Sequence, residues 1–391
     1  MEKVKLKELA DIYLGVTHTP EYIFEGVPFL SVKDISNGKI CFEDCKYISQ
    51  EEYDSLSEGA KPKVGDMLFC RVGTIGKPII IPEGTPIFGS FVSLGYLRNR
   101  NSDRCDLKYL KYWMYSNSFW KQVNANVKGA SQVNLNTGWL SGFDIDLPDI
   151  VEQRYRISVL DKYKSVIEKR KVELSALDEL IKARFVEVFG NPVVNKKHWK
   201  EETLGEITKK IGSGATPKGG KEAYREEGIT LIRSMNVHNG KFEYKDLAHI
   251  SDEQAIKLDN VIVKENDVLL NITGASVARS CIVPEEILPA RINQHVCIIR
   301  CKECINPVFL NKLLIDDNYQ RILWNVACSG ATREAITKQQ IEDLKIIMPP
   351  IELQNQFSEF VRATDKLKVE VQKALDETQL LFDSLMQEYF G

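Results

Sequence analysis

The sequence predicts a mixed α/β fold made of two similar tandem domains, each followed by a long α-helix. Three observations lead to this prediction: an internal repeat across both halves, β-rich and helical runs interleaved at the start of each half, and a long helical pattern that closes each half. The two helices are expected to pair as an antiparallel coiled-coil spacer with pseudo-two-fold symmetry. The predicted domains cover residues 1–147 and 191–348, and the predicted helices cover residues 148–190 and 349–391.

The internal repeat is the strongest of these observations. VGDMLFCRVGTIG at 64–76 aligns with ENDVLLNITGASV at 265–277, an offset of 201 residues. The same offset pairs the GAS segment that begins at Gly129 with the GAT segment that begins at Gly330. Earlier segments match with small gaps: LSVKDISNGKI lies beside IRSMNVHNGKF, and GVTHTP (Gly15–Pro20) lies beside GSGATP (Gly212–Pro217). A period of about 200 residues is far too long for a solenoid, so it indicates a duplicated domain.

The first part of each half has the pattern of a mixed α/β domain. Short β-rich runs such as KPIIIP, DVLLNITG and HVCIIRC are bounded by Gly, Pro and Asn. Helical stretches such as DLKYLKYWMYSNSFWKQV lie between them. The expected domain therefore combines small sheets with short helices.

The second part of each half has the pattern of a long helix. No Pro or Gly occurs between Pro148 and Gly190, and apolar residues recur every seven positions at Leu160, Ile167, Leu174, Ile181 and Val188. The second copy has the same spacing at Phe360, Leu367, Ala374 and Leu381, supported by Val371, Leu375 and Leu385. Forty helical residues would span about 60 Å, which exceeds what one domain core requires. Each helix is therefore expected to pack against the other, and the alternative is that each folds back onto its own domain.

Composition limits the function classes. With 391 residues, 43% of them hydrophobic and 27% charged, the chain can form two ordinary cores. A net charge of −3 argues against a histone-like DNA binder, although a local basic cleft is compatible with it. Nine scattered cysteines do not form a secretory disulfide pattern, and neither a signal peptide nor a membrane span is evident. The expected location is the cytoplasm.

Catalytic and metal-binding motifs are missing from the sequence. An adenine methyltransferase would carry an NPPY-like segment, whereas the nearest strings are NPVV and MPPI. The segment ATPKGGKE fails as a nucleotide-binding loop at both ends, at Ala215 and at Glu222. Cys301 and Cys304 form a single CxxC without the second pair that a structural zinc site needs. The sequence therefore predicts no catalytic residues and no metal site.

Three pairs of segments carry a family resemblance. The segments GVTHTP and GSGATPKGG, the GAS and GAT segments, and the helix starts LPDIVEQ and MPPIELQ resemble those of the type I restriction-modification specificity subunits, the HsdS family. The resemblance covers essentially the whole chain, and both copies keep the same order. The first copy departs from the pattern by having His18 within GVTHTP, and Asp149 where the second copy has Pro350.

The resemblance implies a role and a set of partners. In that family each α/β domain is a target-recognition domain that reads one half of a bipartite site on double-stranded DNA, and the long helices space the domains and dock modification subunits. It implies a chain that is not an enzyme and binds no cofactor, two type I methyltransferase subunits as partners, and restriction motor-nuclease subunits. S-adenosylmethionine, ATP and Mg are then expected on the partners. Two alternatives stay open: a scaffold that binds proteins rather than nucleic acid, and a DNA-modifying enzyme with built-in specificity.

The candidate DNA-binding residues lie in the polar loops of both domains, because Lys, Arg, Ser and Thr contact phosphates while Arg, Lys, Asn and Gln read base edges. In the first domain they are Thr17, His18, Thr19, Lys33, Asn37, Lys39, Arg71, Thr74, Lys77, Lys128, Ser131, Gln132 and Asn134. In the second domain they are Ser213, Thr216, Lys218, Lys221, Arg233, Asn236, His238, Lys241, Asn271, Thr273, Arg279, Thr332 and Arg333. Arg71 and Asn271 are expected to be equivalent positions with different base preferences. The alternative is that such residues simply occupy turns and solvated faces.

Overall fold

The computed structural model describes the whole chain except residues 37, 74, 127–133, 217–223 and 330–333. The chain forms two compact units, one of residues 1–171 with 373–391 and the other of residues 172–372. Two forty-residue helices, α6 (Ile150–Phe189) and α11 (Ile351–Phe390), each contribute one half to each unit. Each unit therefore consists of one α/β domain and two half-helices.

The first unit is built on a four-stranded antiparallel sheet with the order β2-β10-β7-β8. These strands are Ala10–Leu14, Leu94–Asn99, Met67–Cys70 and Gly76–Ile80. A second sheet has the order β6 (Lys46–Ile48), β3 (Val27–Leu30) and β9 (Gly89–Ser90), and two strand pairs complete the unit: β1 (Glu2–Lys5) with β11 (Asp144–Leu147), and β4 (Ile35–Ser36) with β5 (Lys39–Ile40). Its short helices are α1 (Leu6–Leu9), α2 (Gln50–Ser55), α3 (Leu107–Trp113), α4 (Asn117–Asn126) and α5 (Thr137–Ser141).

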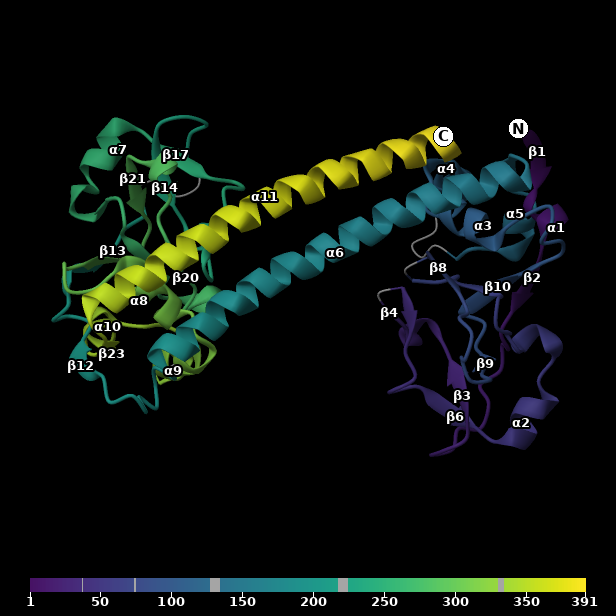
Figure 1. Cartoon of the computed structure of the whole chain (residues 1–391), viewed down its shortest axis with the longest axis horizontal. Coiled ribbons are helices and arrows are strands. Elements are labelled where there is room, and N and C mark those ends of the chain that lie inside the picture. The colour runs from purple at the N-terminus through teal and green to yellow at the C-terminus, as the bar shows by residue number, and fades with distance from the viewer. Residues whose placement is uncertain (37, 74, 127–133, 217–223, 330–333) are drawn as a thin grey trace. The chain divides into compact units, whose positions relative to one another are not determined.

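The second unit repeats this plan. Its four-stranded antiparallel sheet has the order β13 (Thr208–Ser213), β22 (Val296–Cys301), β19 (Val268–Asn271) and β20 (Ser280–Ile282). Its second sheet has the order β17 (Ala248–Ile250), β14 (Ile229–Ile232), β21 (Ala290–Ile292) and β18 (Ile262–Val263), and its strand pairs are β12 (Lys200–Thr203) with β23 (Lys345–Met348), and β15 (Val237–His238) with β16 (Lys241–Phe242). Its short helices are α7 (Asp252–Ile256), α8 (Pro307–Leu314), α9 (Asp317–Cys328) and α10 (Lys338–Glu342). The predicted duplication of a mixed α/β domain is confirmed (Figure 1).

The same buried ion pair stabilises the four-stranded sheet of each unit. In the first, Asp66 accepts hydrogen bonds at 2.9 and 2.7 Å from Nε and Nη2 of Arg98 on β10. In the second, Asp267 accepts two bonds of 2.8 Å from the same atoms of Arg300 on β22. The hydrogen bond from Asp66 raises the pKa of Arg98 above its ordinary value. Bidentate geometry of this kind fixes the start of β7 against β10, and the start of β19 against β22.

The glutamine of each LPDIVEQ or MPPIELQ segment has a structural role. Gln153 is fully buried, and its Oε1 accepts from Asp106 N at 3.0 Å while its Nε2 donates to the carbonyl oxygens of Arg104 and Pro148. Gln354 repeats this arrangement in the second unit, accepting from Asn306 N at 2.9 Å and donating to Pro349 O at 2.8 Å. Asp106 and Asn306 are the N-caps of α3 and α8. Each glutamine therefore joins the start of a long helix to the start of a short one.

We expect Gln153→Leu to lower the free energy of unfolding of the first unit by about 3 kcal/mol, because it leaves one buried donor and two buried acceptors without partners. The exposed Gln50, which bonds only to Asp54 one turn along α2, provides the matched control Gln50→Leu with an expected change under about 0.5 kcal/mol. Urea denaturation followed by fluorescence measures both variants. Equal midpoints for Gln153→Leu and Gln50→Leu would contradict this structural role.

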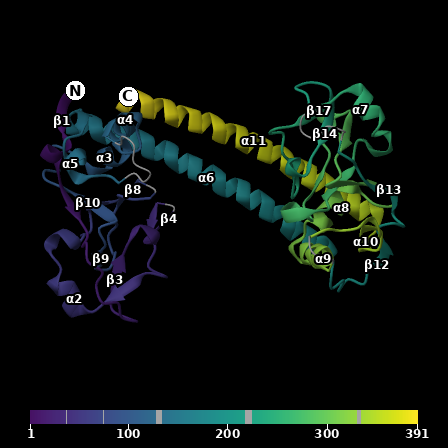
Figure 2. The same ribbon diagram turned by 180° about the vertical axis from the view of Figure 1, so that it is seen from behind.

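The long helices lie side by side and run in opposite directions within each unit (Figure 1 and Figure 2). In the first unit Arg156 donates to Tyr389 O at 3.0 Å, and Arg170 donates to Ala374 O and Thr378 Oγ1. In the second unit Phe185 packs against Phe357, with ring centroids 5.6 Å apart. The predicted antiparallel pairing is confirmed, and the alternative of a helix folded only onto its own domain is wrong. No helix in the described part of the chain has an apolar stretch that could cross a membrane.

The residues that form the helix seam differ from the prediction in α11. Leu160, Ile167, Ile181 and Leu375 are buried, and five further predicted residues are half-buried: Leu174, Val188, Phe360, Val371 and Leu385. Leu367 and Leu381, however, are each 52% exposed, so their predicted packing is wrong. The heptad positions that face α6 are one residue later, at Val361, Lys368, Leu375 and Phe382, alternating with Thr364, Val371, Thr378 and Leu385. Three of these eight residues are polar. A search for apolar residues every seven positions therefore selects the neighbouring stripe of α11, which contains Leu367 and Leu381.

Candidate nucleic-acid interface

In the first unit, Arg71 holds three of the predicted DNA-binding segments together. Its Nε donates to Leu135 O at 3.1 Å, its Nη1 to Val92 O at 2.9 Å, and its Nη2 to Asn134 Oδ1 at 3.3 Å. Val92 N in turn donates to the carbonyl oxygen of Val16, in the GVTHTP segment. Partial burial lowers the pKa of Arg71 from its ordinary value. Three of the five N–H donors of its guanidinium bond to acceptors within the domain, so Arg71 positions these segments.

The equivalent place in the second unit has different chemistry. Thr273 Oγ1 lies 2.6 Å from Nδ1 of His295, and Nε2 of that ring lies 3.0 Å from Nε2 of Gln294. The hydroxyl of Thr216, in the GSGATP segment, donates to Gln294 Oε1. Ala335, just after the GAT segment, forms a β-bridge with Thr273. The same segments therefore converge in both units, and Gln294 and His295 are site residues that the sequence analysis missed.

The structure shifts the predicted alignment of the GVTHTP and GSGATP segments by two residues. Gly15 and Gly214 occupy equivalent places, each passing directly over the neighbouring strand end. A Cβ on Gly15 would overlap the carbonyl oxygen of Ser90, and a Cβ on Gly214 would overlap that of Ile292. Only glycine permits such an approach. Gly15 therefore matches Gly214 rather than Gly212, which places Thr17 opposite Thr216.

The predicted equivalence of Arg71 and Asn271 is wrong. Arg71 N donates to Ser93 O, and Ile272 N makes the same bond to His295 O, so Arg71 corresponds to Ile272. Asp66 and Asp267, which form equivalent ion pairs, are also 201 residues apart. This offset places Asn271 opposite Cys70 on the equivalent strand. The comparison of base preferences between Arg71 and Asn271 therefore does not hold.

Two of the predicted base-reading residues are buried. Asn271 is 0% exposed, and its Nδ2 donates to Ser234 O at 2.8 Å. Asn236 is also 0% exposed, and its side chain accepts from Arg233 N and donates to Glu243 O. Both amides stabilise turns within the domain and cannot reach a base edge, so their assignment as DNA-binding residues is corrected.

The remaining described candidates lie on or near the surface. The exposed ones are Thr17, His18, Thr19, Lys33, Lys39, Asn134, Ser213, Thr216 and Lys241. The half-buried ones are Arg71, Lys77, Arg233, His238, Thr273 and Arg279. Nine candidates lie outside the described residues: Asn37, Thr74, Lys128, Ser131, Gln132, Lys218, Lys221, Thr332 and Arg333.

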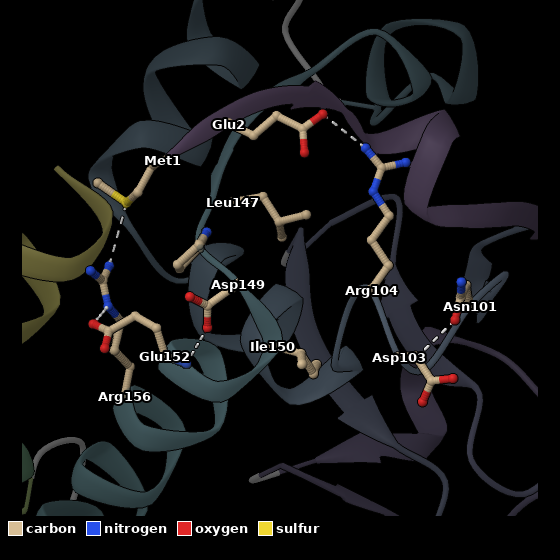
Figure 3. A pocket seen from close by; sticks show the side chains of 11 residues that line it. Met1, Glu2, Asn101, Asp103, Arg104, Leu147, Asp149, Ile150, Glu152 and Arg156 are labelled. Carbon is tan, nitrogen blue, oxygen red and sulfur yellow. Dashed lines mark hydrogen bonds and ion pairs between the residues drawn. The ribbon is translucent and has the colours of Figure 1, made fainter.

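A pocket of about 680 Å³ lies at the start of α6 in the first unit (Figure 3). Its two arginines are paired: Arg104 with Glu2 at 3.1 Å, and Arg156 with Glu152 at 2.7 Å. Asp149 accepts from Glu152 N at 2.9 Å, so it caps the first turn of α6. This capping role explains the acidic residue where the second copy has Pro350, whose carbonyl oxygen accepts from Leu353 N. The pocket is thus part of the helix-start structure.

All nine cysteines are free thiols. Burial raises the pKa of Cys281 and of Cys297 to about 12. Within the described ranges of the chain, no three His, Cys, Asp or Glu side chains come together in a way that could hold a metal ion. The CxxC of Cys301 and Cys304 therefore has no third or fourth ligand among these residues.

Part of the chain matches a known protein family. The family described as "Type I restriction modification DNA specificity domain" matches residues 196–378, which include the second α/β domain and the first part of α11. A relative from Methanocaldococcus jannaschii, named as the MjaX type I restriction enzyme specificity subunit, is 24% identical over 94% of this chain and 88% of its own length. The EcoBI specificity subunit of Escherichia coli is 23% identical over 72% of this chain and 65% of its own length.

Solved structures share the fold over the whole chain. The specificity subunit of a type I restriction-modification system from M. genitalium aligns with a TM-score of 0.61 at 16% identity, covering 100% of this chain and 96% of that one. A chain from a study of complex assembly and conformational transition of the type I system aligns with a TM-score of 0.62 at 17% identity, covering 100% and 97%. Residues 196–378 therefore match the type I restriction modification DNA specificity domain, the chain is similar over 94% of its length to a relative named as a type I specificity subunit, and its fold is that of the solved specificity subunit.

Proposed function

We propose that each α/β domain of this specificity subunit reads one half of a bipartite site on double-stranded DNA, and that the chain itself carries no catalytic centre. One observation supports this most strongly. The two units build the same junction of loops from the same strands, but equip it with different side chains: Val92 and Ser93 in the first, Gln294 and His295 in the second. Two readers with one architecture and different chemistry suit a DNA site with two unlike halves.

The surface residues near these junctions are the proposed DNA contacts. Lysines and hydroxyls such as Lys33, Lys39 and Thr17 suit phosphate oxygens, and the exposed amide of Asn134 suits a base edge. Phosphate contacts fix the register of a protein on the duplex, and base contacts select the sequence. The candidates outside the described residues, which flank the same junctions in the sequence, remain part of this proposal.

The proposed partners are those that the resemblance to type I specificity subunits implies. Two methyltransferase subunits would bind this chain and supply S-adenosylmethionine chemistry on adenine, and motor-nuclease subunits would supply ATP- and Mg-dependent cleavage. The complex would act in the cytoplasm. The chain would contribute position and sequence choice to each reaction.

Sequencing of DNA methylation in a methylation-free host tests this role. We expect the cognate methyltransferase expressed with this chain to produce adenine methylation at one bipartite, asymmetric motif, and the methyltransferase alone to produce none, because it lacks the reader. Purification of the complex serves as the control for assembly. A verified complex that leaves the DNA unmethylated, or a methyltransferase that shows the same motif without this chain, would rule the proposal out.

A further inference from the structure

The turn between β21 and β22 presents an exposed glutamine, Gln294, whose amide keeps part of its hydrogen-bonding capacity unused. Gln294 is exposed, whereas the residue before it, Asn293, is 6% exposed. Asn293 N donates to Ile232 O at 3.0 Å, and Asn293 Oδ1 accepts from His295 N at 3.0 Å. Gly214 N donates to Asn293 O at 3.2 Å. These bonds, on both sides of Gln294, therefore fix the position from which it projects.

The side chain of Gln294 is oriented by two neighbours. Its Oε1 accepts from the hydroxyl of Thr216, and its Nε2 donates to Nε2 of His295 at 3.0 Å. With Nε2 of His295 as acceptor, the proton of the ring lies on Nδ1, which donates to Thr273 Oγ1 at 2.6 Å. In this chain of three bonds, both ends of the Gln294 amide have a partner within the domain.

The network leaves half of the hydrogen-bonding capacity of the amide unused. A glutamine amide has two N–H donors and two acceptor lone pairs on its oxygen. One donor serves His295 and one lone pair serves Thr216, so one donor and one acceptor of the exposed amide remain unused. In the major groove, adenine presents the complementary pair, an acceptor at N7 and a donor at N6.

We propose that Gln294 reads an adenine in the half-site of the second domain, with Thr216, Thr273 and His295 as positioning residues. This inference rests on the proposed function. The first domain has no glutamine at the equivalent position. The equivalent arginines Arg98 and Arg300 are 202 residues apart in the sequence, and the same offset places Val92 opposite Gln294. The adenine contact therefore belongs to one half-site only.

The test uses the purified complex of the full chain with its methyltransferase, after the wild-type methylation motif has been determined. Duplexes carry 7-deazaadenine, which lacks the N7 acceptor, at each adenine of the second half-site in turn. At one position we expect wild-type binding to weaken about 10-fold, as the loss of one good base contact implies. For Gln294→Ala the same replacement should change binding less than about twofold, because the donor to N7 is already missing.

Two further variants make the result decisive. Gln294→Glu keeps the size and the acceptor but has no donor for N7, so it should resemble Gln294→Ala in its response to 7-deazaadenine. Gln339→Ala removes an exposed glutamine of the same domain that bonds only to Asp343, and it should respond as wild type does. The proposal is overturned if the second half-site contains no adenine on either strand, or if Gln294→Ala and Gln294→Glu keep the full response at every adenine. Failure of the proposed function would show earlier, as the absence of any bipartite motif with the wild-type chain.

Discussion

Asp267→Ala is expected to destabilise the second unit by about 3–5 kcal/mol, because it leaves the guanidinium of Arg300 without its carboxylate. Asp267 is 0% exposed and Arg300 retains 20% of its side-chain exposure. Both carboxylate oxygens are in use: besides the two bonds from Arg300, Oδ2 accepts from Lys264 N at 2.7 Å. The substitution therefore removes three hydrogen bonds at the end of the β19–β22 pair opposite to the turn that holds Gln294.

Hydrogen exchange followed by mass spectrometry measures this effect unit by unit. Peptides from β19 and β22 should exchange about 100- to 4,000-fold faster in Asp267→Ala, while those from β7 and β10, which keep the Asp66–Arg98 pair, should be unchanged. Glu303→Ala is the matched control, since Glu303 forms an ion pair with Lys209 at 3.6 Å and its side chain is 98% exposed. We expect under about 1 kcal/mol from the control. Similar exchange in the two variants would refute a stabilising role for the buried pair.

Much of the fold can be predicted from the sequence because the sequence contains two copies of the same domain and helix. The shared offset of Asp66 with Asp267 and of Gly73 with Gly274 indicates the duplication, and the absence of Pro and Gly after Pro148 indicates the first long helix. α6 begins at Ile150, two residues after that proline. These signals depend on local patterns, which a single sequence contains.

The helix seam of α11 could not be assigned by the same reasoning. A heptad scan follows apolar residues, whereas the seam of α11 includes Lys368, which pairs with Asp178 of α6 at 2.6 Å. Thr364 and Thr378 are also buried there, each bonded to a carbonyl oxygen of its own helix. A scan for apolar heptad positions does not count these three polar residues, although they lie in the seam.

The reading site was also only partly predictable. The polar loops can be found in the sequence. Asn271 and Asn236 differ from the exposed candidates in being buried, and burial depends on tertiary packing that the sequence does not show directly. Gln294 and His295 lie in a short turn between two strands, and one signal was available: the repeat offset changes from 201 residues at Asp66 to 202 at Arg98. The second copy therefore has one extra residue between these positions, in the interval that contains the turn.

The two domains are expected to read DNA independently, so replacing residues 1–147 should change one half-site completely. The replacement is the first domain of a related specificity subunit of known specificity, joined at the start of α6 so that both long helices are retained. Each domain makes its own loop junction from its own strands, and the second unit contains Gln294, Thr216 and His295 together. The second half-site should therefore be kept, including its adenine.

Methylation sequencing of the exchanged chain with its cognate methyltransferase is the most direct test of the central claim, and the wild-type chain expressed in the same host is the control. The account predicts a new motif that joins the donor's first half-site to the unchanged second half-site. A motif in which both half-sites change, or in which neither does while the exchanged complex assembles and methylates DNA, would contradict the assignment of one half-site to each domain.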